Sequence, residues 1–170
     1  MDFLKLCEDR YSMRKFDGRP LDDAHIDKIL EAARLAPTAK NLQPQRIFVL
    51  KSEEALEKLG ESTSCTFGTK TAFFICYNKN ESWKSDFDGK DSGYVDSAIV
   101  LTHMTLAATS LGIGSTIVMW YDCEKLKASL GLPENLEPVC VLVTGDPHPD
   151  AHPSRLHTIR KEKEQFTDFI

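Results

Sequence analysis

Apolar residues recur along the chain at helical spacing in some segments and in short unbroken runs in others. One helix face is predicted from four apolar positions, namely Ile26, Ile29, Leu30 and Ala33. Asp22 precedes this helix as an N-cap. Pro37 disfavours helical geometry in the residue before it, so the helix should end near Leu35 or Ala36. A shorter helix before it should end near Arg10.

Four short, mainly apolar runs predict buried strands, over residues 47–50, 72–77, 115–119 and 139–144. Ser52 is expected to cap a helix that runs through Leu59 and stops at Gly60. Asp122 should cap another, through Leu130. The longest expected helix covers 94–111 and is apolar around much of its circumference, which indicates a central position. Segment 78–93 is polar and predicts an exposed loop. Strands and helices alternate unevenly, so a three-layer α/β or α+β domain follows.

The chain has 170 residues, which suits a single domain. Apolar residues make up 41% and aromatic residues 9%, as in globular proteins, and the formal net charge is -5. A weakly acidic protein repels a phosphate backbone, so nucleic acid is not an expected partner. No apolar stretch has the length of a membrane span, and Met1 to Lys5 shows no signal core, so no membrane association is expected.

The cysteines are odd in number and widely spaced, which predicts reduced thiols in a cytoplasmic protein. Cys76 and Cys140 lie in runs expected to be buried strands, which makes reactive thiols the weaker interpretation. The five histidines show no helical metal pair, and no metal site is expected. No Walker loop or nucleophile signature occurs, and Gly112-Ile113-Gly114 lacks the third glycine of a dinucleotide fingerprint.

A first candidate motif is Arg10-Tyr11-Ser12-Met13-Arg14, which sets two guanidinium groups and a hydroxyl in one polar turn. Arginine presents planar, forked donors that suit phosphate oxygens. By itself the motif favours a solvated basic turn over a binding site.

A second candidate segment runs from Ala36 to Gln45, where small residues and amides follow an amphipathic helix. Small side chains let a backbone approach a flat ligand, and an asparagine offers both a donor and an acceptor. An ordinary proline-rich connector is the alternative.

A third candidate is Leu111-Gly112-Ile113-Gly114-Ser115, between the long helix and a buried strand. Glycine permits positive φ and close approach of main-chain N–H groups to a ligand. A Schellman-type helix stop would also explain it.

Together, the three segments occur in the order and at the separations of the FMN-dependent nitroreductase family, which the chain resembles from about Arg10 to Arg155. The resemblance implies an α+β fold, a three-layer α/β/α sandwich with a central mixed, mainly antiparallel sheet and a long buried central helix. It implies one FMN-binding domain over 1–170. The C-terminal extension 146–170 would pack on the partner of a homodimer that holds FMN at its interface.

The resemblance also implies the cofactor-binding residues, which are Arg10, Tyr11, Ser12, Arg14, Pro37, Thr38, Ala39, Asn41, Gly112, Ile113, Gly114 and Arg155. The first segment would hold the flavin phosphate and ribityl chain, with Arg14 at the ribityl chain or the pyrimidine edge. The loop 37–41 would reach the flavin bound mainly by the other subunit. The glycine segment would lie along the isoalloxazine, and Arg155 would grip the phosphate. Gln43 should brace its own loop.

The implied reaction is ping-pong hydride transfer from NADH or NADPH through flavin N5 to a nitroaromatic, a quinone or a similar electron-poor acceptor. A cation such as Arg14 would stabilise the negative charge that develops at the flavin N1–C2 edge. No acid or base is needed, so no catalytic residue is predicted. Lys70 is ambiguous between a flavin contact and a surface charge. Three alternatives stay open: another flavin reaction on the same scaffold (dehydrogenation, reductive dehalogenation or flavin fragmentation), a non-enzymatic FMN-binding protein, and a structural domain without cofactor.

Overall fold

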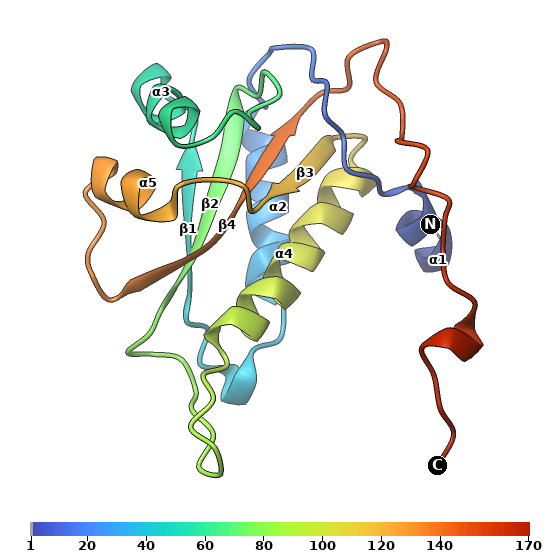
Figure 1. Ribbon diagram of the computed structural model, residues 1–170. Coiled ribbons are helices and arrows are strands. Elements are labelled where there is room, and N and C mark those ends of the chain that lie inside the picture. The colour runs from blue at the N-terminus through green and yellow to red at the C-terminus, as the bar shows by residue number, and fades with distance from the viewer. Residues whose placement is uncertain (1) are drawn as a thin grey trace.

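A four-stranded sheet forms the middle layer of the fold, as the computed structural model of residues 2–170 shows (Figure 1). Its strands lie in the order β1 (Gln45–Leu50), β2 (Thr71–Asn78), β4 (Leu136–Gly145) and β3 (Gly114–Val118). Neighbouring strands pair antiparallel, and an isolated bridge between Ser12 and Ser115 adds parallel pairing. The expected α+β fold with a mainly antiparallel sheet is confirmed.

Helices cover both faces of this sheet. α2 (Asp23–Leu35) and α4 (Gly93–Ser110) lie on one face, while α3 (Glu53–Ser62) and α5 (Cys123–Ser129) lie on the other (Figure 1). Successive side chains of β2 point to opposite faces of the sheet, so the core has two halves. Phe73 packs with α2 and α4, and Phe74 packs with α3 and α5. α1 (Phe3–Asp9) contacts α4 from outside. Two short 3-10 turns, η1 (Ala39–Asn41) and η2 (Lys163–Gln165), complete the described elements.

Helix starts were predicted better than helix ends. Asp22 caps α2 by accepting a hydrogen bond from the His25 N–H at 2.7 Å, and the helix ends at Leu35 as expected. Ser52 caps α3 in the same way, but the expected stop at Gly60 is wrong, because α3 continues to Ser62. Gly60 keeps ordinary helical backbone there, so it is no C-cap.

The long helix α4 keeps one strip exposed. Its inner residues pack on the sheet and on α2, and Val100 and Met104 are fully buried. On the outer side, Tyr94, Val95 and Ala98 are exposed, with 62% of Val95 accessible. The predicted central helix is therefore confirmed, but a single chain does not cover it on all sides. Among residues 2–170, no helix is both long and apolar enough to cross a membrane.

Gly114 allows the N-terminal segment to pack on β3. A methyl group at this position would come within 2.1 Å of the Met13 sulfur. Gly114→Ala should therefore lower the free energy of unfolding by about 1–3 kcal/mol, as overpacking of a filled core does. Gly60→Ala is the matched control, because its methyl group would meet nothing within 4 Å and should stabilise α3 by about 0.5–1 kcal/mol. Urea unfolding measures both, and equal effects would contradict the packing role of Gly114.

Candidate functional site

The segment that follows α1 runs alongside β3 as an extended chain. The Met13 N–H donates to the Ser115 carbonyl at 3.0 Å, and the Thr116 hydroxyl donates to the Met13 carbonyl. Met13 and Phe16 are buried. Arg14, next to Met13, is exposed, while Arg10 and Ser12 are half-buried. Buried apolar anchors thus fix the backbone and leave the polar side chains of the motif available.

These polar side chains line a cavity of about 260 Å³, the arginine cavity. Its lining residues are Arg10, Tyr11, Ser12, Arg14, Ser154, Leu156, His157 and Arg160. The C-terminal segment closes one side, because His157 Nε2 donates to the Glu8 carbonyl at 2.9 Å. The His157 and Tyr11 rings also meet edge to face, with centroids 6.0 Å apart.

The arginine cavity has a strongly positive lining. Three arginines line it, and among the described residues no Asp or Glu does. Arginine ion pairs in residues 2–170 involve Arg19, Arg34 and Arg46, which lie elsewhere. Burial raises the pKa of the Tyr11 phenol, so this group stays a neutral donor. Such a donor set suits a phosphate group.

A second cavity, of about 250 Å³, adjoins the first at Tyr11. We refer to it as the glycine cavity, and its lining residues are Asp9, Tyr11, Met13, Thr109, Gly112, Ile113, Gly114 and Pro147. Gly112 has φ +77° and ends α4 in a Schellman motif, in which the Ile113 N–H donates to the Ala108 carbonyl at 2.9 Å. The helix-stop interpretation is therefore correct, and the same glycine also lines a cavity.

The loop with Pro37, Thr38, Ala39 and Asn41 lies at the opposite end of α4. The Ala39 N–H donates to the Asp96 carboxyl at 2.8 Å, in the first turn of that helix. The glycine cavity lies past its last turn. An 18-residue helix spans about 27 Å. One chain therefore joins the first and third motifs but not the second.

Gln43 braces this loop, as predicted. Its side-chain amide donates to the Asn41 carbonyl at 3.2 Å, and its backbone N–H donates to the Thr38 hydroxyl at 3.0 Å. Lys40, Asn41 and Gln43 all have φ between 50° and 55°, a region that such residues seldom adopt. These bonds hold an uncommon backbone in one shape.

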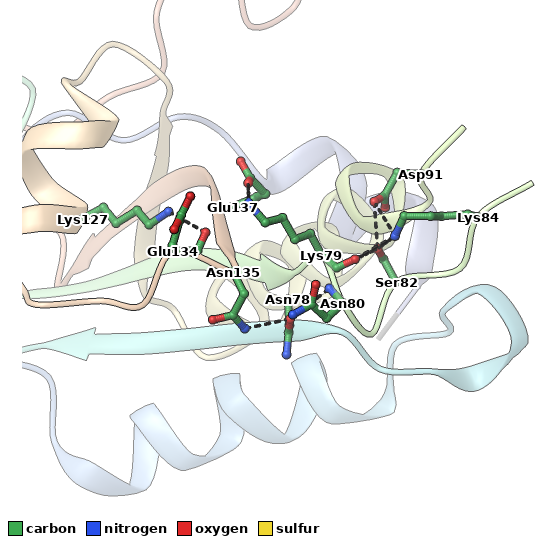
Figure 2. Close-up of polar contacts among 10 residues, drawn as sticks. All are labelled: Asn78, Lys79, Asn80, Ser82, Lys84, Asp91, Lys127, Glu134, Asn135 and Glu137. Carbon is green, nitrogen blue, oxygen red and sulfur yellow. Dashed lines mark hydrogen bonds and ion pairs between the residues drawn. The ribbon is translucent and has the colours of Figure 1, made fainter. Parts of the chain in front are cut away.

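Residues 79–92, predicted as an exposed loop, form a hairpin with an anchored stem. Figure 2 shows Asn135 donating to Asn78 and Lys79 paired with Glu137, at 2.9 and 3.1 Å. Lys84 pairs with Asp91 across the hairpin. The Lys40 ammonium lies 5.7 Å from the centre of the Trp83 ring, so the hairpin also contacts the loop 37–41.

Several predicted residues lie away from the two cavities, and several residues that line the cavities were not predicted, among them Arg160 and His157. Arg155 is exposed and does not line the arginine cavity, whereas Arg160 does. His157 also lines this cavity and is half-buried. The only signal for either was its place in a polar, charged tail. Lys70 lines a separate cavity of about 740 Å³ beside α3.

The cysteines do not supply a reactive group at either cavity. All five are free thiols, and burial raises the pKa of both Cys76 and Cys140 to about 12. Their thiols stay protonated at neutral pH, which agrees with the interpretation of these residues as buried strand positions.

Comparisons with known proteins agree on one family. The model of the Nitroreductase family matches residues 7–72 and 65–146. A protein of Archaeoglobus fulgidus, provisionally named an NADH dehydrogenase/NAD(P)H nitroreductase, is 35% identical over 153 residues, which cover 85% of this chain and 84% of the relative.

Two solved structures extend this result. A nitroreductase family protein from Clostridium difficile is 33% identical and superposes with a TM-score of 0.91, over 99% of this chain and 98% of its own. A provisionally named nitroreductase from Exiguobacterium sibiricum, solved in complex with FMN, has the same fold at 20% identity. Its TM-score is 0.86, with coverage of 100% and 98%.

Proposed function

Because the chain belongs to the nitroreductase family, we propose that it is an FMN-dependent oxidoreductase. It takes reducing equivalents from NADH or NADPH and passes them to a small electron-poor acceptor such as a nitroaromatic or a quinone. The observation that carries this proposal is the arginine cavity, which three arginines and Ser12 line. The relative named an NAD(P)H nitroreductase and the FMN complex of a structural neighbour support it.

The donor set fits the phosphate of FMN. A phosphate dianion accepts several charge-assisted hydrogen bonds, and Arg10, Arg14 and Arg160 offer forked donors without a carboxylate beside them in the lining. The adjoining glycine cavity has no side chain at Gly112 or Gly114. These features suit a flat ring joined to a phosphate-bearing chain.

Each group of residues has a distinct task under this proposal. Arg10, Ser12 and Arg160 bind the phosphate, Tyr11 separates the two cavities, and the segment 112–114 supports the ring. FMN, when bound, supplies the hydride chemistry, and the protein provides position and electrostatics. No side chain has to move a proton, so we assign no catalytic residue.

We propose a homodimer because one chain leaves the site incomplete. The loop 37–41 lies too far along α4 to reach the cavities of its own chain, so it serves the flavin of the partner. The exposed strip of α4 offers an apolar contact. The extension 146–170 has three exposed apolar side chains, Phe166, Phe169 and Ile170. β3 is an edge strand of the sheet, and its Ile117 is also exposed. We expect this extension to pack on the partner, in a cytoplasmic enzyme whose thiols stay reduced.

The experiment that tests the function follows the flavin. Purified protein should be yellow, release FMN on denaturation, and bleach when NADH or NADPH is added without oxygen. A nitroaromatic or a quinone should then restore the colour. Protein that binds no FMN at micromolar concentration would contradict the proposal. FMN that stays oxidised with both nicotinamides would favour a non-enzymatic FMN-binding protein, and colour restored only by other acceptors would favour another flavin reaction.

Arg14 has two candidate roles, and a single variant can distinguish them. If its guanidinium lies at the pyrimidine edge, Arg14→Ala should lower the flavin reduction potential by about 30 mV or more, equivalent to about 1.4 kcal/mol for a two-electron couple. If it binds the phosphate, FMN affinity falls and the potential is unchanged. Potentiometric titration of flavin-loaded protein measures the first quantity, and an unchanged potential would contradict the pyrimidine role.

A further inference from the structure

Asp96 is a buried carboxyl group in the first turn of α4, with 2% of its surface exposed. One oxygen accepts the Ala39 N–H at 2.8 Å. The other accepts the Ser92 hydroxyl at 2.7 Å. Ser92 ends the hairpin 79–92, and Ala39 begins the turn η1. A single side chain therefore joins the loop 37–41, the base of the hairpin and the long helix.

The attachment of Ala39 matters because the next residues have an uncommon backbone. Lys40 and Asn41 are both in the left-handed region, with φ 50° and 55°. The bonds through Thr38 and Gln43 shape the loop internally. The bond to Asp96 fixes the loop to the rest of the molecule. If this bond were lost, the loop could keep its internal shape but would lose its attachment to α4.

Burial of this carboxyl group is costly in itself. In the part of the chain that the structure describes, Asp96 forms no ion pair with Lys, Arg or His. The hydrogen bonds from Ala39 and Ser92 and the N-terminus of α4 offset this cost. Because the two donors come from the turn η1 and from the end of the hairpin, the carboxyl group joins both segments to α4.

We propose that Asp96 is a positioning residue for the flavin site, because it holds the loop 37–41 where the partner's FMN is bound. This inference rests on the proposed function, since it assumes that the loop contacts FMN. Asp96 itself touches no ligand and acts through the Ala39 N–H. The arginine and glycine cavities of one subunit would form most of the FMN site. The loop 37–41 of the other subunit would complete it, and Asp96 of that other subunit would fix the position of the loop.

The test compares Asp96→Ala with Asp96→Asn in the full-length protein. Loss of the carboxyl group should weaken FMN binding about tenfold and change the visible circular dichroism of bound FMN, because a hydrogen bond to a charged group is lost. Asparagine still presents an oxygen to Ala39, so Asp96→Asn should stay within about threefold of the wild type. Fluorescence titration with FMN measures the affinity, and thermal unfolding measures the stability.

Asp122→Ala is the matched control. It also removes a carboxyl group that accepts a backbone N–H at a helix start, from Lys125 at 2.9 Å, but on α5 across the sheet. It should lower stability and leave FMN affinity unchanged. Wild-type affinity and circular dichroism in Asp96→Ala would overturn the positioning role, while absence of FMN from the wild type would overturn the proposed function itself.

A second variant keeps the test decisive if Asp96→Ala does not fold. Ala39→Pro removes the N–H that Asp96 accepts and leaves the carboxyl group in place. Thr38 has φ -134° and ψ 159°, a backbone that suits a residue before proline. The variant should weaken FMN binding about as much as the loss of Asp96. Wild-type affinity here would show that the bond does not position the loop.

Discussion

Replacing Arg10 with alanine is expected to weaken FMN binding by about a hundredfold or more. A hydrogen bond to a charged group contributes about 1.5–3 kcal/mol, and a guanidinium can donate two to one phosphate. Arg10 is half-buried at the arginine cavity, so solvent replaces it poorly. Arg10→Lys should lose about tenfold, because the charge stays while the fork is lost. Titration of apoprotein with FMN and with riboflavin measures these effects.

Riboflavin, which lacks the phosphate, is the internal control for this prediction. Its affinity should be weak for the wild type and nearly the same for Arg10→Ala. Equal losses for FMN and riboflavin would mean that Arg10 supports the fold and does not bind phosphate.

Two further arginines offer a matched pair in the same C-terminal segment. Arg160 lines the arginine cavity, and Arg155, which family resemblance favoured, does not. Arg160→Ala should therefore cost more FMN affinity than Arg155→Ala. The reverse order would show that the segment is rearranged when FMN binds.

Most of the architecture could be predicted from the sequence, because strands and helix starts depend on residues that are close together in the chain. Apolar runs gave the strands, and Asp22, Ser52 and Asp122 marked helix starts, since each side chain accepts a hydrogen bond from the first turn. β4 was predicted too short. It begins at Leu136, ahead of Pro138, and its antiparallel pairing with β2 outweighs the poor strand propensity of that residue.

The candidate site was less predictable, since its assembly depends on contacts between distant segments. The three motifs could be recognised, and the family resemblance implied that the loop 37–41 serves the other subunit, but only the fold places them at the two ends of α4. His157 joins the cavity through a bond to Glu8, 149 residues away. In the sequence Asp96 is one polar position on an otherwise apolar helix, and only its contact with Ala39 gives it a role. Local patterns do not encode such pairings.

Ala98→Glu should separate the proposed homodimer and release FMN with it. Ala98 lies with Tyr94 and Val95 on the exposed strip of α4, and in a dimer packed there the new carboxylate would be buried without a partner. Such a charge costs about 2–5 kcal/mol, which raises the dimer dissociation constant at least about thirtyfold. Sedimentation velocity across a concentration series, followed by flavin absorbance, measures both effects together.

Ala128→Glu is the control for this last prediction, because Ala128 is also an exposed helical alanine, on α5 across the sheet. It adds the same charge and should leave both the dimer and the FMN content unchanged. The decisive measurement is whether FMN affinity falls when the dimer dissociates. If each FMN needs the loop 37–41 of the partner, monomeric Ala98→Glu must bind FMN more weakly even though its own arginine cavity is intact. A folded monomer with wild-type FMN affinity would show that one chain holds the cofactor alone, and that the loop has another task.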